Sequence, residues 1–426
     1  DSYMNTSPLA YRRVIGLAWP FILANAAVPL LGLVDTAVIG NLGSAQDLGA
    51  IAFGALIFSF VYWGFGFLRM GTTGFVAQAA GASDFLEVRA VLGRSMLLAV
   101  GLGCLMIVLQ LPVQWLAFSF LNGSDDVEQM AALYFSIRIW GAPATLMGFV
   151  GTGFLVGIGR SKTLLWLQLF LNGLNILLDI LLAGVLGLGA AGIALGTVIS
   201  EWFAALLGAV LLHRVLLEMS PAGESFWPLE KILDQKKLAQ SLAANLDIMI
   251  RTLLLVFSFA FFTNQGARFG DIALAANHIL LQIISFSAFF LDGFAFAAEG
   301  LVGRAFGTGD SLQFMTAVRR TSVLAAISAV VLAAIVLLFG ADLIAALTDL
   351  PAVRLAASNL TYLAAIYILL SVAAFQLDGI FIGASCTRQM CYGAIQSVLF
   401  FLLVCWMLVP RFGITGLWWS MIPYVV

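Results

Sequence analysis

Acid and amide side chains lie inside apolar, membrane-length segments of this 426-residue chain, where they could bind a proton or a hard cation. Asn175 and Asp179 are four residues apart and so share one helical face, and Asp35 lies in an earlier apolar segment. An ionised Asp at the centre of a bilayer costs about 2.5 to 3.5 kcal/mol on insertion scales. Two carboxylates in one poorly solvated site repel each other, which favours uptake of a proton or of Na⁺.

Further polar side chains are expected in the same outer layer of the membrane. Asp35 lies about 8 Å below the outer end of its helix, and Thr197 and Tyr134 fall at a similar depth in two other helices. Asn172 precedes Asn175 by about one turn and is a further candidate for this site. Alternatively, these residues cap or bridge helices or face a wet vestibule, and Arg138 neutralises one acid in a structural ion pair.

Composition identifies the class of protein that must position these groups. The chain is 62% apolar and 10% charged, with a mean hydropathy of +1.05, which indicates a polytopic, all-α membrane protein. Its net charge of −2 gives no reason to expect a nucleic-acid partner. The four cysteines have no metal-ligand spacing and suggest no disulfide framework. We expect no signal peptide, because Arg12 and Arg13 lead directly into an apolar span without a cleavage site.

Apolar runs of about 20 residues predict twelve transmembrane helices. They begin near Val14, Leu48, Val88, Met130, Ser161, Ala191, Gln240, Ile272, Phe314, Ser358, Arg388 and Gly413. Residues 214–238, which contain two prolines and a charged stretch, are predicted to be a cytoplasmic linker between an N-lobe (1–213) and a C-lobe (239–426). The last helix of the C-lobe is short. Six helices in each lobe imply a pseudo-twofold axis along the membrane normal.

The two lobes are related by an internal repeat. A shift of 226 residues places residues 67–84 over 293–310 and carries Gly157 onto Gly383. The embedded acids do not follow the repeat, because Asp35 falls on Phe261 and Asp179 on Cys405. The sequence therefore predicts that the ionisable site belongs to the N-lobe alone.

Basic residues predict the orientation of the chain. If the amino terminus is cytoplasmic, the inside segments hold fourteen Lys and Arg residues and the outside loops hold three. This bias favours cytoplasmic placement of both termini.

The C-lobe has a different polar cluster. Asp247 and Arg251 are one turn apart, and Asp378 lies near the inner end of another helix. These three residues are expected to form an ion pair that holds helices together, or alternatively an inner gate or a second ion site. In the N-lobe, Pro20 and Pro29 interrupt the helix that carries Asp35 and could serve as a hinge or as a static kink.

Several strings resemble the multidrug and toxic compound extrusion (MATE) family. They are residues 34–40 (VDTAVIG) following Pro20, the Asn175/Asp179 pair, and two strings that resemble the bacterial DinF-type branch, 245–252 (NLDIMIRT) and 376–383 (QLDGIFIG). The resemblance covers nearly the whole chain. It implies a V-shaped, two-lobed antiporter of the bacterial inner membrane that exchanges H⁺ or Na⁺ for bulky, often cationic, amphipathic compounds. It also implies that the family's first-lobe cation and substrate site is formed by Asp35, Asn175, Asp179, Thr197 and Tyr134.

Other functions are less compatible with the sequence. A flippase for a lipid-linked precursor is the alternative, but it would need several cations for a phosphate headgroup, and the deeply embedded bases are Arg138 and Arg251. No HExxH, GxSxG or Walker A motif is present, so we expect neither an enzyme nor an ATP-driven pump. We expect a monomer without a cofactor, driven by H⁺ or alternatively by Na⁺ bound at Asp35, Asn175, Asp179 and Thr197.

Overall fold

The protein is described by a computed structural model over residues 9–42, 44–120, 124–219 and 227–425, and in these ranges it is helical with no strand. Helix contacts divide the chain into two units. The N-unit is Ala26–Asn245, and the C-unit is Asp1–Asn25 together with Leu246–Val426. The expected all-α fold is therefore confirmed. The two units differ from the predicted lobes in where they place the first part of the first helix and residues 214–245.

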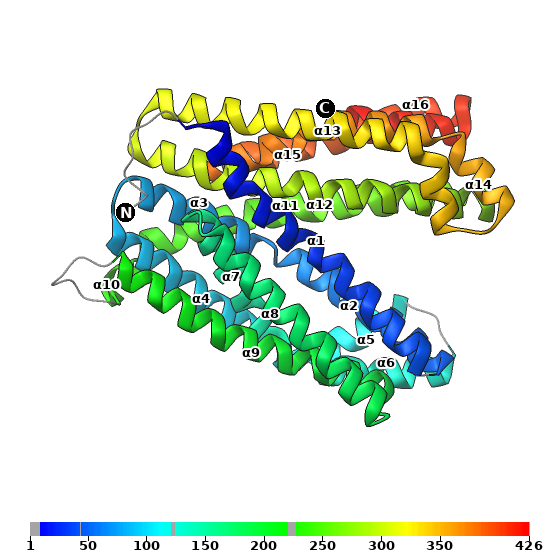
Figure 1. Ribbon diagram of the computed structural model, residues 1–426, viewed down its shortest axis with the longest axis horizontal. Coiled ribbons are helices and arrows are strands. Elements are labelled where there is room, and N and C mark those ends of the chain that lie inside the picture. The colour runs from blue at the N-terminus through cyan, green and yellow to red at the C-terminus, as the bar shows by residue number, and fades with distance from the viewer. Residues whose placement is uncertain (1–8, 43, 121–123, 220–226, 426) are drawn as a thin grey trace. The chain divides into compact units, whose positions relative to one another are not determined.

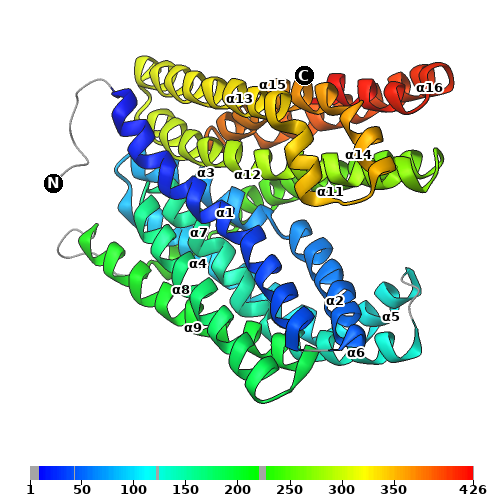
Figure 2. The same ribbon diagram turned by 45° about the vertical axis from the view of Figure 1, so that its right-hand side comes forward.

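Most of the N-unit consists of long helices that pack around α7. Figures 1 and 2 show α8 and α9 side by side, and α3 and α4 both contact α7. The helices are α2 (Ala45–Gly64), α3 (Phe67–Gly81), α4 (Phe85–Val108), α5 (Gln110–Phe120), α6 (Asp125–Arg138), the 3₁₀ turn Ile139–Gly141, α7 (Ala142–Gly157), α8 (Ser161–Asp179), the π-helical segment Ile180–Val185, α9 (Gly189–Glu218) and α10 (Leu229–Ile232).

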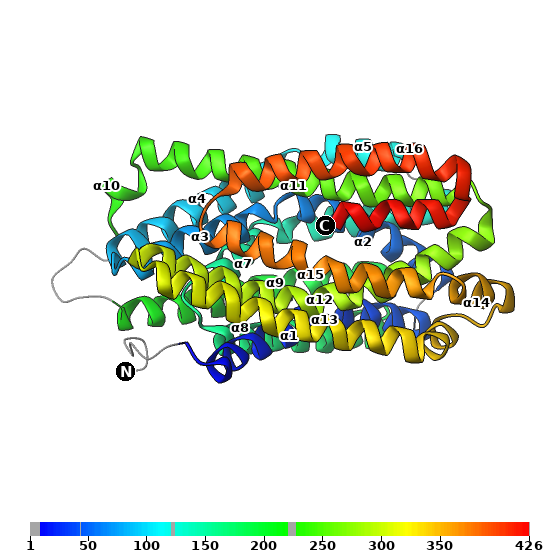
Figure 3. The same cartoon turned by 90° about the horizontal axis from the view of Figure 1, so that it is seen from above.

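The C-unit is centred on three helices that contact one another, α12, α13 and α15. Its helices are α12 (Asp271–Thr308), α13 (Ser311–Leu347), α14 (Pro351–Ser358), α15 (Thr361–Gly383) and α16 (Thr387–Val425). The chain reverses within α16, as Figure 3 shows, at Gly413 with φ 61° and ψ −134°. A positive φ of this kind suits glycine because it has no Cβ.

Twelve membrane crossings are consistent with these helices. Within the described residues, ten stretches are long and apolar enough to span a membrane. They are Gln46–Gly81, Phe85–Val108, Asp125–Gly157, Ser161–Val185, Gly189–Glu218, Gln235–Ala267, Asp271–Thr308, Ser311–Leu347, Thr361–Gly383 and Thr387–Val425. The helix α1 (Tyr11–Leu42) precedes them, and the turn at Gly413 divides the last stretch where the twelfth span was predicted to begin.

Glycines shared by the two repeats occupy equivalent packing positions. A Cβ on Gly157 would lie 2.9 Å from the carbonyl oxygen of Thr73, and a Cβ on Gly383 would lie 2.6 Å from that of Glu299. The same 226-residue shift relates both members of the first pair to the second. These glycines therefore allow close approach of α7 to α3 and of α15 to α12.

Shared aspartates begin corresponding helices. Asp84 Oδ1 accepts the backbone N–H of Glu87 at 3.0 Å at the start of α4, and Asp310 Oδ1 accepts that of Leu312 at 2.9 Å at the start of α13. An aspartate in this position satisfies N–H groups that have no partner in the first helical turn. The residues conserved between the two repeats thus have structural roles.

Two helices cross the boundary between the units. The first part of α1 belongs to the C-unit, where a Cβ on Gly293 of α12 would lie 2.8 Å from Cα of Ile22. The boundary falls between Asn25 and Ala26, that is, between Pro20 and Pro29. In the same way, α11 (Gln235–Ala267) begins in the N-unit and continues into the C-unit. Because the first part of α1 belongs to the C-unit, the N-unit begins at Ala26 and not at residue 1, where the predicted N-lobe begins.

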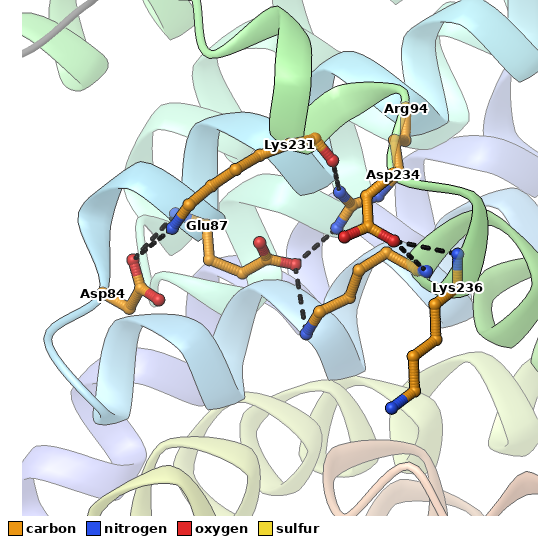
Figure 4. Close-up of polar contacts among 7 residues, drawn as sticks. Asp84, Glu87, Arg94, Lys231, Asp234 and Lys236 are labelled. Carbon is orange, nitrogen blue, oxygen red and sulfur yellow. Dashed lines mark hydrogen bonds and ion pairs between the residues drawn. The ribbon is translucent and has the colours of Figure 1, made fainter.

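The predicted linker is largely helical where it is described. It includes the end of α9, the short α10 and the start of α11, while residues 220–226 lie outside the described residues. Figure 4 shows how this segment is held on α4. Arg94 donates to the backbone oxygen of Lys231 at 2.6 Å and pairs with Glu87 at 2.5 Å, and Glu87 also lies 3.7 Å from Nζ of Lys237. Polar contacts therefore anchor residues 231–237 to the N-unit.

Candidate functional site in the N-unit

Asp179 ends α8 and is completely buried, with 0% exposure. The amide of Asn175, oriented with its nitrogen toward Asp179, donates to both carboxylate oxygens, at 3.2 and 3.3 Å. On the neighbouring α9, a Cβ on Gly196 would lie 2.8 Å from Asp179 Oδ1. The i, i+4 pair predicted from sequence is thus formed, and the carboxylate packs against the backbone of α9.

The surroundings of Asp179 depart from regular helical geometry. The π-helical segment Ile180–Val185 follows it directly, and π-helical turns occur often at functional sites. Thr197 is buried beside Gly196, but its hydroxyl donates to the carbonyl of Ile193 in its own helix at 3.0 Å. Thr197 therefore follows the glycine that approaches Asp179, and its hydroxyl donates within its own helix.

Asn172 and Asp35 connect α8 with α1 less directly. Asn172 Nδ2 donates to the backbone oxygen of Ala27 at 3.4 Å, which joins α8 to the part of α1 that belongs to the N-unit. Asp35 lies further along α1, and its side chain falls outside the described residues. The pairing of Asp35 with Asp179 stays a prediction.

Tyr134 is buried on α6 and contacts a base that the sequence placed nearby. Arg138 Nη1 donates to Tyr134 Oη at 2.9 Å, and the guanidinium carbon lies 4.7 Å from the centre of the Phe58 ring. A Cβ on Gly54 of α2 would lie 2.2 Å from the Tyr134 ring, so only glycine fits there. Aromatic rings of α2 and the hydroxyl of Tyr134 thus hold Arg138 on the inner side of α6.

Glu201 is a neighbour of Arg138 that was not among the predicted site residues. It interacts electrostatically with Arg138 and Tyr62, and a Cβ on Gly141 would lie 2.2 Å from Glu201 Oε2. A signal was present in the sequence, because Glu201 follows Thr197 by four residues, as Arg138 follows Tyr134. Each charged residue therefore shares a helical face with a predicted site residue.

In the C-unit, two of the three predicted cluster residues form an ion pair. Arg251 of α11 forms an ion pair with Asp378 of α15, and the two side chains are 17% and 25% exposed. Asp247 lies one turn earlier and instead accepts a hydrogen bond from Thr387 Oγ1 at 3.2 Å, at the start of α16. The three predicted residues thus join α11 to two different helices.

Metal-binding capacity is limited in the part of the chain that is described. No three His, Cys, Asp or Glu side chains there gather into a cluster that could hold a metal ion. A Na⁺ beside Asp179 would therefore need amide, hydroxyl or carbonyl oxygens as its other ligands.

Comparisons with known proteins agree with this architecture. The MatE family model matches residues 20–181 and 248–407. The chain is 38% identical to "DNA damage-inducible protein F" of Escherichia coli, over 88% of this chain and 81% of that protein. It is 29% identical to "Probable multidrug resistance protein NorM" of Rhizobium meliloti, over 75% of this chain and 67% of that protein.

A solved structure shows the same fold. The outward-facing conformation of a multidrug resistance MATE family transporter superposes with a TM-score of 0.85 at 19% identity and covers 97% of this chain and 92% of that chain. The family match extends over both halves of the repeat, which agrees with the duplicated architecture. The chain is therefore a multi-pass membrane protein that belongs to the MatE family of transporters.

Proposed function

We propose that this protein is a secondary antiporter that exports lipophilic or cationic compounds in exchange for H⁺, with Na⁺ as the alternative coupling ion. Asp35 and Asp179 are the coupling acids in this proposal. The observation that carries it is the complete burial of Asp179 in a membrane-spanning helix, in contact with Asn175 and with the backbone of α9. A buried carboxylate that can be neutralised by a proton can exist in two states of different charge.

The surroundings of Asp179 favour H⁺ over Na⁺. A hard cation of this kind prefers several oxygen ligands. Near Asp179, the Asn175 amide presents its nitrogen and not its oxygen. Protonation needs no such ligand set, so it requires less rearrangement of these side chains.

Drug export is better supported than lipid flipping. An anionic headgroup would need bases that are available to bind phosphate. Arg251 pairs with Asp378, and Arg138 donates to Tyr134. Both embedded bases therefore already have a polar partner within the protein.

In this proposal the protein acts as a monomer in the bacterial inner membrane, with both termini in the cytoplasm. The excess of Lys and Arg in one set of loops supports this orientation. Pro20 and Pro29 flank the point where α1 passes from one unit to the other, which supports a hinge in this helix. Replacing Pro20 with Ala should then slow transport; an unchanged rate would leave only a static kink.

The test is efflux of ethidium by the full chain in proteoliposomes that carry a pH gradient, a Na⁺ gradient or neither. We expect efflux driven by the pH gradient with or without Na⁺, and its loss in Asp179→Asn and Asp35→Asn. Efflux driven only by the Na⁺ gradient would show that the coupling ion is Na⁺ and not H⁺. Full efflux by both variants would refute the assignment of the coupling acids.

A matched control is available at an exposed position. Asp349 is fully exposed and pairs with Arg354 at 3.0 Å. Asp349→Asn makes the same chemical change outside the proposed site, so its efflux should equal that of the wild type. A similar loss of efflux in this variant would show that removing a negative charge impairs transport even outside the proposed site.

A further inference from the structure

Glu201 and Arg138 form a second group of embedded charges in the N-unit, next to the proposed coupling site. They come from α9 and α6, and Tyr62 of α2 and Thr145 of α7 adjoin Glu201. Within the described residues no ion pair joins Arg138 directly to Glu201, although the two interact electrostatically. The two charges are therefore close without being in contact.

Three buried polar atoms in this group have no hydrogen-bond partner among the described residues. They are Tyr62 Oη, Glu201 Oε2 and Arg138 Nε. Buried polar groups are nearly always hydrogen-bonded, because an unsatisfied one costs about 1 to 3 kcal/mol. These three atoms lie on three different helices, so α2, α6 and α9 each bring a polar atom to the group.

The group lies on helices that also carry predicted site residues. Glu201 lies one helical turn after Thr197, and Gly196 beside Thr197 contacts Asp179. On α6, Arg138 donates to Tyr134, which is also a predicted site residue. Thr197 and Glu201 thus share one face of α9, and Tyr134 and Arg138 share one face of α6.

We propose that Glu201 is a further proton-carrying carboxyl of the transport cycle and that Arg138 positions it. This inference rests on the proposed proton-coupled function and adds a second acid to it. When Glu201 is ionised, Arg138 balances its charge. When Glu201 accepts a proton from water, the new O–H can donate to an acceptor such as the Tyr62 hydroxyl oxygen, and Arg138 becomes available to other groups.

The charges that face Glu201 favour a proton over a metal cation. Arg138 approaches from α6, the hydroxyl of Tyr62 from α2, and that of Thr145 from α7. A fixed guanidinium repels Na⁺ but does not prevent neutralisation of the carboxylate by H⁺. The group is therefore suited to gain and lose one proton.

The experiment measures proton release on binding of ethidium to the purified full chain in lightly buffered detergent, with a pH-indicator dye, between pH 5.5 and 8.5. Wild type is compared with Glu201→Gln, Glu201→Asp and Asp179→Asn. We expect Glu201→Gln to release fewer protons per bound ethidium, by up to about one, while it still binds ethidium at high pH. Glu201→Asp should restore most of the release.

Control variants separate a proton-carrying role from a structural one. Glu218→Gln lies on the same helix in an exposed ion pair with Arg160 and should behave as wild type. If Glu201→Gln does not fold, the double variant Arg138→Gln/Glu201→Gln, which leaves no single buried charge, supplies the same measurement. Proton release equal to that of wild type at every pH would overturn the role of Glu201. Absence of release in wild type itself would instead refute proton coupling of the whole protein.

Discussion

Embedded charges are neutralised differently in the two units. In the C-unit, Arg251 and Asp378 form a direct ion pair between α11 and α15. In the N-unit, Asp179 is bound by the amide of Asn175, and Glu201 is near Arg138 without an ion pair. A direct pair holds both charges in place, whereas a buried carboxylate that accepts hydrogen bonds from an amide can be neutralised by a proton. Under the proposed function, the first arrangement has a structural role and the second a coupling role.

Neither arrangement belongs to the ancestral repeat. The 226-residue shift places Arg251 on Asn25 and Asp378 on Thr152, and it places Arg138 on Ala364. By contrast, the glycines and helix-capping aspartates that the repeats share have equivalent contacts in both units. The common scaffold was therefore specialised separately in each half.

The largest expected difference between the units is in transport. Asp179→Asn should reduce pH-driven ethidium efflux at least about tenfold, because the amide cannot gain or lose a proton. Asp378→Asn should retain more than half of the efflux and lower thermal stability instead. Efflux in proteoliposomes and thermal unfolding in detergent measure the two effects. Equal loss of efflux in both variants would contradict the division of roles.

Much of the fold could be predicted from composition and the repeat. Apolar runs located the crossings, and even the turn at Gly413 coincides with the predicted start of the twelfth span. The unit boundary could not be predicted, because the first part of α1 packs through Ile22 against Gly293, more than 250 residues away. Hydropathy identifies which segments enter the membrane, but it contains no information about which of them pack together.

The candidate site shows the same limit. The Asn175/Asp179 pair follows from helical periodicity within one segment, and it is formed. The proximity of Glu201 to Arg138 depends on the packing of α9 near α6, which no local pattern encodes. Asp247 likewise contacts Thr387 on another helix, although its nearest basic residue in sequence is Arg251. Local spacing therefore identified candidate polar residues, but it did not decide which of them pair across helices.

The second prediction compares the shared scaffold in the two units. Gly153→Ala would place a Cβ 2.2 Å from the carbonyl oxygen of Arg69, and Gly379→Ala would place one 2.8 Å from that of Ala295. The repeat relates the two positions. Both variants should be destabilised, by about 1 to 3 kcal/mol, because backbone atoms must move apart, with the larger effect at Gly153. Denaturant or thermal unfolding in detergent measures this.

A control for helix propensity is provided by Gly173, where a Cβ would meet no atom within 4 Å. Gly173→Ala should be neutral or slightly stabilising. Destabilisation of Gly153→Ala no greater than that of this control would show that α3 and α7 do not depend on close approach.

The third prediction concerns the ion pair of the C-unit. Arg251→Met leaves Asp378 without this partner and should destabilise the protein by about 1 to 2 kcal/mol, less than for a fully buried pair because both side chains are partly exposed. The double variant Arg251→Met/Asp378→Leu should recover most of that loss. Thermal unfolding of the wild type, the two single variants and the double variant completes the cycle. Additive effects would show that the two side chains do not stabilise each other.

The helices that cross between the units begin with comparable anchors. Arg94 of α4 donates to the backbone oxygen of Lys231 before α11, and Arg320 of α13 donates to that of Leu9 before α1. The repeat relates the two arginines. Arg320 also lies over the ring of Tyr11, at 5.1 Å from its centre. Each unit therefore holds the start of a helix that continues into the other.

The smallest expected effect is a pH dependence of the protein's stability that arises at the first of these anchors, the start of α11. Asp234 Oδ1 accepts the backbone N–H groups of Lys236 and Lys237 at 2.8 and 3.1 Å at the start of α11. The N–H of Lys237, the N–H of Lys236 and the charges of Arg94 and Lys237 together lower the pKa of Asp234. A lowered folded-state pKa stabilises the protein above the unfolded value of about 3.9, and this stabilisation is lost as the pH falls through the folded value.

Asp234→Asn isolates the contribution of the charge, because asparagine can still accept the same backbone hydrogen bonds. We expect its melting temperature to be slightly below that of wild type above about pH 5, with the difference shrinking as the pH approaches 3. Asp234→Ala, which removes the acceptor as well, should remain less stable than Asp234→Asn at both pH values. A difference between wild type and Asp234→Asn that grows on acidification would be incompatible with a lowered pKa. In that case the charge of Asp234 would not stabilise the start of α11. The start of α11 would then depend on the contact of Arg94 with Lys231, as the start of α1 depends on the contact of Arg320 with Leu9.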